Sequence, residues 1–166
     1  MFELKLLSQD GVDAALQKAE RYRLLNEAWQ AESICRDVLR IEPENQRALT
    51  TLVLAITDQF RTEGAQRMEE ARSLLQELRS EYARCYYAGI ICERRGMAQL
   101  NRHTLGAGYI AYDWLRQAMG WYEKAEALRP PGNDESILRW NTCVRLIDRH
   151  HEIQAAPEAE LPMQLE

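Results

Sequence analysis

The sequence predicts an all-α protein built from consecutive antiparallel helix pairs. Apolar residues recur at steps of three and four through most of the 166 residues, which is the spacing of one face of an α-helix. The five prolines and eight glycines gather at a few points, so the stretches between them can form long helices. Proline residues also follow two of these periodic stretches directly, at Pro43 and Pro130, where they would end a helix.

Composition and charge narrow the functional classes. The chain is 46% hydrophobic and 28% charged, which is ordinary for a single soluble domain with a core of useful size. Its net charge of −5 argues against nucleic acid as the main partner, because phosphate binding requires a basic face. The N-terminal apolar run is too short for a signal peptide or anchor, and no stretch reaches the roughly 18 apolar residues of a membrane span. We therefore expect a cytoplasmic protein without membrane insertion.

Four cysteines are spread along the chain without any CxxC pair. This spacing favours reduced, buried thiols over a disulfide framework or a metal site. They are Cys35, Cys85, Cys92 and Cys143.

The first helix pair is predicted over residues 10–25 and 28–41. Asn26 follows the first helix and tolerates the left-handed conformation that ends many helices. The second helix ends at Glu42 and Pro43. Two short helices joined by a tight turn and closed by a proline form a helical hairpin.

A recurring spacing of small and aromatic residues resembles the tetratricopeptide repeat (TPR), a helix pair of about 34 residues. In the stretch AMGWYEKAEALRP, Ala118, Tyr122 and Ala125 share one helix face and Pro130 ends the helix. The first pair shows the same spacing in a degenerate form, at Ala19, Tyr22, Ala31, Cys35, Val38 and Pro43. The resemblance implies a right-handed superhelical solenoid of three TPR-like hairpins and a C-terminal capping helix.

The remaining elements follow from periodicity. The second helix pair is predicted over residues 45–60 and 65–80, and the third pair over residues 81–95 and 109–129. The capping helix is predicted over residues 136–150. Gly96 is expected to end the fifth helix. We expect one repeat domain over residues 1–152 and a flexible acidic tail over residues 153–166.

Two alternatives remain for the third pair. In the first, Gly89 pairs with Ala118, and the repeat carries an insertion of about 17 residues, estimated against the 34-residue pattern. In the second, Leu105, Gly106 and Tyr109 carry the first-helix signature, so that residues 97–112 form a separate helix. We favour the first, because the second leaves residues 81–95 as an unpaired helix.

The resemblance implies a function as well as a fold. TPR domains bind an extended or helical peptide in the concave groove formed by the first helices of successive repeats. The lysine and asparagine clamp of one subfamily is absent, since Leu16, Glu20 and Thr51 stand in its places. The groove candidates in this chain are Gln17, Glu20, Arg23, Arg47, Thr50, Thr51, Leu54, Tyr86, Tyr87, Ile90 and Arg94.

The sequence contains none of the common motifs of catalysis. The sequence has no GxSxG, no nucleotide-binding glycine loop and no HExxH, so we predict no enzyme activity, no cofactor and no metal. The expected function is non-catalytic protein binding as an adaptor or scaffold, with another protein or peptide as partner. One alternative is a structural homo-oligomer formed through exposed Trp114 or Trp121. Another is a ligand site at the loop that contains His103.

Overall fold

The chain is all-α, as the sequence predicts. The computed structural model describes residues 2–62 and 65–157, and within these ranges it contains seven α-helices, one short 3-10 helix (Gln9–Gly11) and no strand. The α-helices are α1 (Val12–Leu24), α2 (Ala28–Ile41), α3 (Gln46–Asp58), α4 (Ala65–Leu75), α5 (Glu81–Leu100), α6 (Ala107–Leu128) and α7 (Glu135–Arg149).

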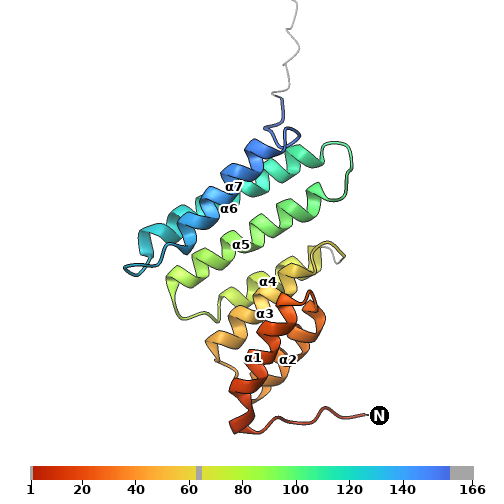
Figure 1. Cartoon of the computed structure of the whole chain (residues 1–166), viewed down its shortest axis with the longest axis vertical. Helices are drawn as coiled ribbons and strands as arrows, with labels where there is room; N and C mark the ends of the chain where they lie inside the picture. The colour runs from red at the N-terminus through yellow and green to blue at the C-terminus, as the bar shows by residue number, and fades with distance from the viewer. Residues whose placement is uncertain (1, 63–64, 158–166) are drawn as a thin grey trace, which may run out of the picture.

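The helices stack along the long axis of the molecule, and each runs roughly antiparallel to the helix before it (Figure 1). The pairing of α5 with α6 is the most extensive, since these are the two longest helices and they lie side by side. Side-chain caps fix the starts of two helices. Asn45 Oδ1 accepts a hydrogen bond from the Ala48 amide at 2.9 Å, and Ser80 Oγ accepts one from the Ala83 amide at 3.2 Å.

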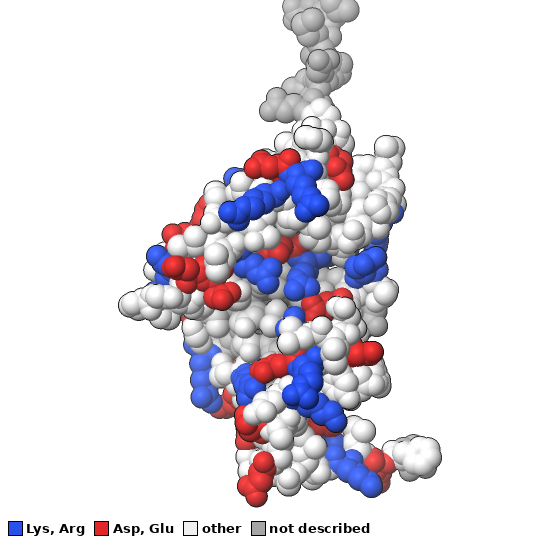
Figure 2. Space-filling view, viewed as in Figure 1, with Lys and Arg blue, Asp and Glu red and all other residues white. Residues whose placement is uncertain are grey.

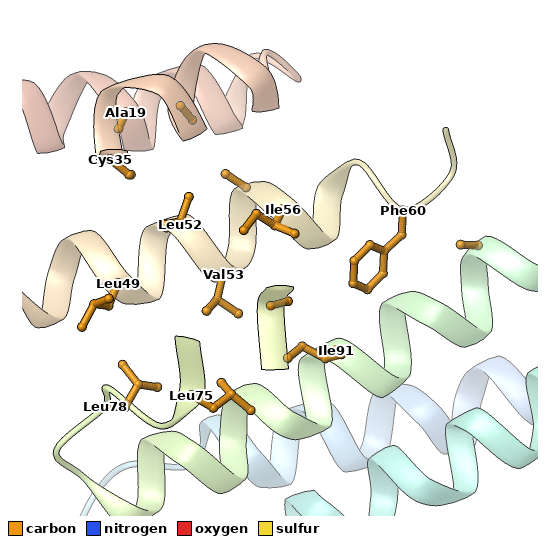
Figure 3. Close-up of a cluster of buried hydrophobic side chains, with 14 residues drawn as sticks. Ala19, Cys35, Leu49, Leu52, Val53, Ile56, Phe60, Leu75, Leu78 and Ile91 are labelled. Carbon is orange, nitrogen blue, oxygen red and sulfur yellow. The ribbon is translucent and has the colours of Figure 1, made fainter. Parts of the chain in front are cut away.

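A first hydrophobic cluster is centred on α3, which contributes four large side chains that point to both sides (Figure 3). Helix α3 is therefore covered on most of its circumference, and eight of its residues are buried. The cluster includes Ala19 of α1, Cys35 of α2, Leu49, Leu52, Val53 and Ile56 of α3, Phe60 and Leu78 of the turns, Leu75 of α4 and Ile91 of α5.

A second cluster joins α5, α6 and α7. Its largest fully buried side chain is Tyr122 of α6, which packs with Leu115 of α6 and Cys143 of α7. Helix α5 belongs to both clusters, because the consecutive residues Ile90 and Ile91 lie about 100° apart around its axis and pack into different clusters. The two halves of the molecule are thus held together mainly through one helix.

Glycines allow α5 and α6 to approach closely. A Cβ atom at position 89 would lie 2.6 Å from Cδ1 of Tyr122, so only glycine leaves room for this ring. A Cβ atom at Gly96 would lie 3.2 Å from the carbonyl oxygen of Ala111. The prediction that Gly96 ends the fifth helix is wrong: the helix passes through it to Leu100, because this glycine serves interhelical packing.

The structure decides between the two alternatives for the third pair. Residues 101–106 form the turn between α5 and α6, so the separate helix over residues 97–112 is wrong. Gly89 packs against Tyr122, one turn beyond Ala118, and α5 pairs directly with α6, as the first alternative predicts. The residues that exceed the repeat pattern of about 34 residues form no long loop, because most of them lengthen α5 and α6.

The folded part of the chain extends one residue past the predicted domain boundary at residue 152. Ile153 is 3% exposed and packs with the second cluster, and Gly108 lies directly against the Glu152 backbone. Residues 154–157 follow as an exposed segment without helix. The rest of the predicted tail, residues 158–166, lies outside the described residues.

All four cysteines are buried and free, as predicted. Burial raises the pKa of the Cys35 thiol to about 12 and that of Cys143 to about 12. None of the helices in the described ranges combines the length and the apolar character that crossing a bilayer requires.

Candidate functional site

The predicted binding residues come from α1, α3 and α5, and most of them lie on one side of the molecule. We call this side the α1/α3/α5 face, and define it by Glu20, Arg23, Arg47, Thr50, Leu54, Asp58, Tyr87 and Arg94, which are exposed or half-buried. Figure 2 views the molecule from the side on which α1 and α7 are nearest, and shows basic side chains across its middle with acidic ones beside them.

One end of the α1/α3/α5 face is held by an ion-pair cluster. The Arg47 guanidinium on α3 donates to both carboxylate oxygens of Glu20 on α1, at 2.7 and 2.9 Å, and to Asp13 at 2.7 Å. The hydrogen bond from Arg47 holds the pKa of Glu20 below its usual value, although burial opposes this effect. Because these side chains are largely solvated, the pairs position the helices without adding much stability.

At the other end, Asp58 is shared by two arginines. Arg23 Nε on α1 donates to Asp58 Oδ2 at 2.9 Å, and Arg94 Nη1 on α5 donates to Asp58 Oδ1. Asp58 closes α3, so one carboxylate links the last turns of α1 and α3 to α5. Sequence reasoning named Arg23 and Arg94 but missed Asp58. The signal was present, since the three residues are 35 and 36 positions apart, close to one repeat length.

These side chains line a pocket of about 400 Å³. We call it the Arg23 pocket, and its lining is Arg23, Asn26, Ala28, Asp58, Arg61 and Arg94. Asn26 adopts the left-handed conformation at φ 61°, as the sequence suggested, and this turn brings Ala28 back against the pocket. The lining holds three guanidinium groups and a single carboxylate, so the pocket carries an excess of positive charge in a chain whose net charge is −5.

Large apolar side chains flank the Arg23 pocket in sequence. Leu25 is 63% exposed and Trp29 is 65% exposed, and they lie next to the lining residues Asn26 and Ala28. Exposed aromatic side chains beside arginines are typical of protein interfaces.

Tyr86 and Tyr87 point to different neighbours. Burial raises the pKa of Tyr87, and a hydrogen bond with Thr50 of α3 opposes the rise. The Tyr86 hydroxyl lies 3.2 Å from Glu135 Oε2 of α7, and its ring packs 6.0 Å from that of Tyr122. Tyr87 therefore belongs to the α1/α3/α5 face, whereas Tyr86 connects α5 to the last helix.

Two predicted binding residues are inaccessible. Thr51 is 5% exposed and Ile90 is 1% exposed, because their positions on α3 and α5 point into the packed interior. Ile90 belongs to the second hydrophobic cluster. Gln17 is exposed but donates a hydrogen bond to Asp13 on its own helix at 2.8 Å, away from the Arg23 pocket.

A second surface depression lies between α4 and α6 over α5. This pocket of about 550 Å³, which we call the Trp121 groove, includes Leu75, Ala88, Ile91 and Trp121. Trp121 is 36% exposed, and the Lys124 ammonium lies 4.3 Å from the centre of its ring. Trp114 is half-buried, with the Arg72 guanidinium 5.9 Å from its ring, so Trp121 is the more accessible of the two.

His103 lies in the turn between α5 and α6, where its backbone has a positive φ of 51°. Its side chain is exposed and lines a pocket of about 440 Å³ together with Glu152. No group of three His, Cys, Asp or Glu side chains within the described residues is placed to hold a metal ion.

No protein-family model matches this chain, and comparisons with curated proteins and with solved structures find no significant match either.

Proposed function

We propose that this chain is a TPR-like helical repeat that binds a peptide of another protein without catalysing a reaction. In this proposal α1–α2, α3–α4 and α5–α6 are three successive hairpins of a right-handed solenoid, and α7 covers the last one. Pro43 and Pro130 follow the second helices α2 and α6, at the place that the repeat pattern gives to proline. The free, buried cysteines suit a reducing compartment such as the cytoplasm.

The observation that carries this proposal is the convergence of α1, α3 and α5 on the Arg23 pocket. Side chains from three helices that are not adjacent in sequence meet there around one carboxylate. Their mutual ion pairs hold them in place before a partner arrives, which lowers the entropy cost of binding. The remaining guanidinium donors and exposed Trp29 are available for contact.

Selection from a random bead-displayed peptide library, in which serine and threonine occur both with and without phosphate, tests the proposal. We expect wild-type protein to enrich peptides, and the variant R47Q/R94Q to bind the best of them at least fivefold more weakly in calorimetry. R40Q is the matched control, since Arg40 is exposed on α2 outside the α1/α3/α5 face. Circular dichroism verifies that the variants remain helical. Failure to enrich any peptide, or equal binding by both variants, contradicts the proposal.

Self-association is the second candidate, and the N-terminal segment favours it. Residues 2–6 form neither helix nor strand, and three of their apolar side chains, Phe2, Leu4 and Leu6, are 105%, 75% and 66% exposed. The segment projects away from the helices (Figure 1), so these residues could bury their area against a second copy. The Trp121 groove offers apolar side chains for them to contact.

Analytical ultracentrifugation tests this candidate. A dimer that dissociates in L4S/L6S and in W121A supports docking of the N-terminal segment into the Trp121 groove of a second copy. A protein that sediments as a monomer at all concentrations up to about 100 μM, well above the micromolar range of weak specific association, rules it out.

A further inference from the structure

The Arg23 pocket has the charge and the donors of an oxyanion site. We propose that it binds a phosphorylated serine or threonine of a peptide partner. This inference rests on the proposed peptide-binding function and adds the chemistry of the group that is recognised.

The charge of the pocket favours a dianion. Arg23, Arg61 and Arg94 carry three positive charges, and Asp58 supplies one negative charge, so two positive charges remain uncompensated among the lining residues. A phosphorylated side chain carries a charge of about −1.5 to −2 at neutral pH, whereas a carboxylate carries only one negative charge. Phosphate therefore matches the excess charge of the pocket better than Asp or Glu does.

The hydrogen bonds to Asp58 hold the guanidinium groups of Arg23 and Arg94 in place and use only some of their N–H donors. Arg23 uses Nε and Arg94 uses Nη1 in their bonds to Asp58, and a guanidinium has five N–H donors. Asp58 thus fixes both guanidinium groups and leaves their other donors for a ligand with several acceptor oxygens. The side chains of Arg23 and Arg94 are 19% and 30% exposed, so water only partly screens the interaction.

Arg61 adds a third guanidinium from the turn that follows α3. It is exposed, and in the described part of the chain it makes no ion pair within 4.0 Å. It can therefore be replaced without removing a contact that holds helices together. This property makes Arg61 the suitable position for a test.

The surroundings of the pocket favour a peptide over free phosphate. Leu25 and Trp29 are exposed and adjoin the lining residues Asn26 and Ala28 in the sequence, so apolar residues that flank a phosphorylated side chain could contact them. A free phosphate ion would leave them uncovered. We therefore expect affinity to depend on both the phosphate group and its apolar neighbours.

Three synthetic peptides measure this dependence: acetyl-GLXLG-amide with phosphoserine, glutamate or serine at X, titrated by NMR. We expect the phosphoserine peptide to bind at least tenfold more tightly than the serine peptide, with the glutamate peptide between them. The Nε–Hε signals of Arg23 and Arg94 should shift on addition of the phosphopeptide. Inorganic phosphate should bind at least fivefold more weakly than the phosphopeptide.

R61Q should lower the affinity for the phosphoserine peptide about tenfold, because one charge-assisted interaction is lost. R40Q, which removes an exposed arginine outside the pocket, should leave the affinity unchanged. Equal affinities of the three peptides, equal losses in R61Q and R40Q, or phosphate binding as tight as peptide binding would each overturn the inference. If unphosphorylated peptides from the library still bind the α1/α3/α5 face, the proposed function survives that outcome.

Discussion

At the residue scale, the contact between Gly89 and Tyr122 is a tight packing constraint. Tyr122 is fully buried, and its hydroxyl donates a hydrogen bond of 2.6 Å to Glu93 Oε2. The ring can neither move outward nor tilt freely without breaking that bond in the interior. A side chain at position 89 therefore has no space available.

The variant G89A should be destabilised by about 1–3 kcal/mol, because the added methyl group overpacks the α5–α6 contact. This loss exceeds the gain of up to about 1 kcal/mol that alanine brings to a helix interior. Urea denaturation of the full chain measures the difference.

G120A is the matched control for G89A. Gly120 also lies in a helix, α6, but a Cβ atom there would meet no atom within 4 Å. We expect G120A to stabilise the protein by about 0.5–1 kcal/mol. If the two variants change stability in the same direction, the packing explanation for Gly89 is wrong.

At the scale of the element, helix α7 is attached through a buried carboxylate. Glu93 of α5 is 4% exposed, and it accepts hydrogen bonds from Tyr122 of α6 and, at 3.2 Å, from Arg139 of α7. Trp140 adds a hydrogen bond of 3.1 Å to Glu123 of α6. One carboxylate thus fixes three helices relative to one another.

The variant R139Q should loosen α7, because it leaves the Glu93 carboxylate with less compensation for its burial. We expect a loss of about 1–3 kcal/mol in unfolding free energy and faster hydrogen exchange over residues 135–149. R145Q alters an exposed arginine of the same helix and should change neither quantity. Uniform acceleration of exchange over all helices would contradict a local role for Arg139.

Periodicity in the sequence predicted the helices themselves, including the last helix α7 and the turn at Asn26. Periodicity did not predict features that depend on contacts between residues far apart in the sequence. Glycine often ends a helix, so Gly96 was predicted to do so. The glycine instead leaves room for the carbonyl oxygen of Ala111 on α6, which a Cβ atom at this position would crowd. Thr51 and Ile90 were assigned to the surface because a 34-residue pattern does not give the exact rotation of each helix. Asp58 escaped notice because its role depends on two arginines in other helices.

At the scale of the whole molecule, buried hydroxyl and thiol groups should make the free energy of unfolding fall at alkaline pH. Burial raises the pKa of Tyr86 to about 12, despite the nearby charge of Arg139, and it raises those of Cys35 and Cys143 to about 12. Their folded-state pKa values lie above those of the unfolded chain, so ionisation favours unfolding. Their contribution is complete below about pH 9, the ordinary pKa of a thiol, and is lost as the pH rises towards 12.

The free energy of unfolding should therefore fall steadily between about pH 9 and 11, by up to about 1.4 kcal/mol per pH unit for each group that ionises on unfolding. Urea titrations at several pH values measure this slope. Y86F removes one of the groups and should give a shallower slope above pH 10. Stability that stays constant up to pH 11 would show that these groups are not buried in solution.

The position of α5 in both hydrophobic clusters also bears on how the molecule unfolds. Ile91 and Ile90 anchor the same helix in the N-terminal and the C-terminal cluster, respectively. Neither cluster can lose this helix without exposing the other, so the two halves should melt in one cooperative transition. A binding event at the Arg23 pocket, which includes Arg94 of α5, would thereby raise the melting temperature of the entire chain, including the distant α7.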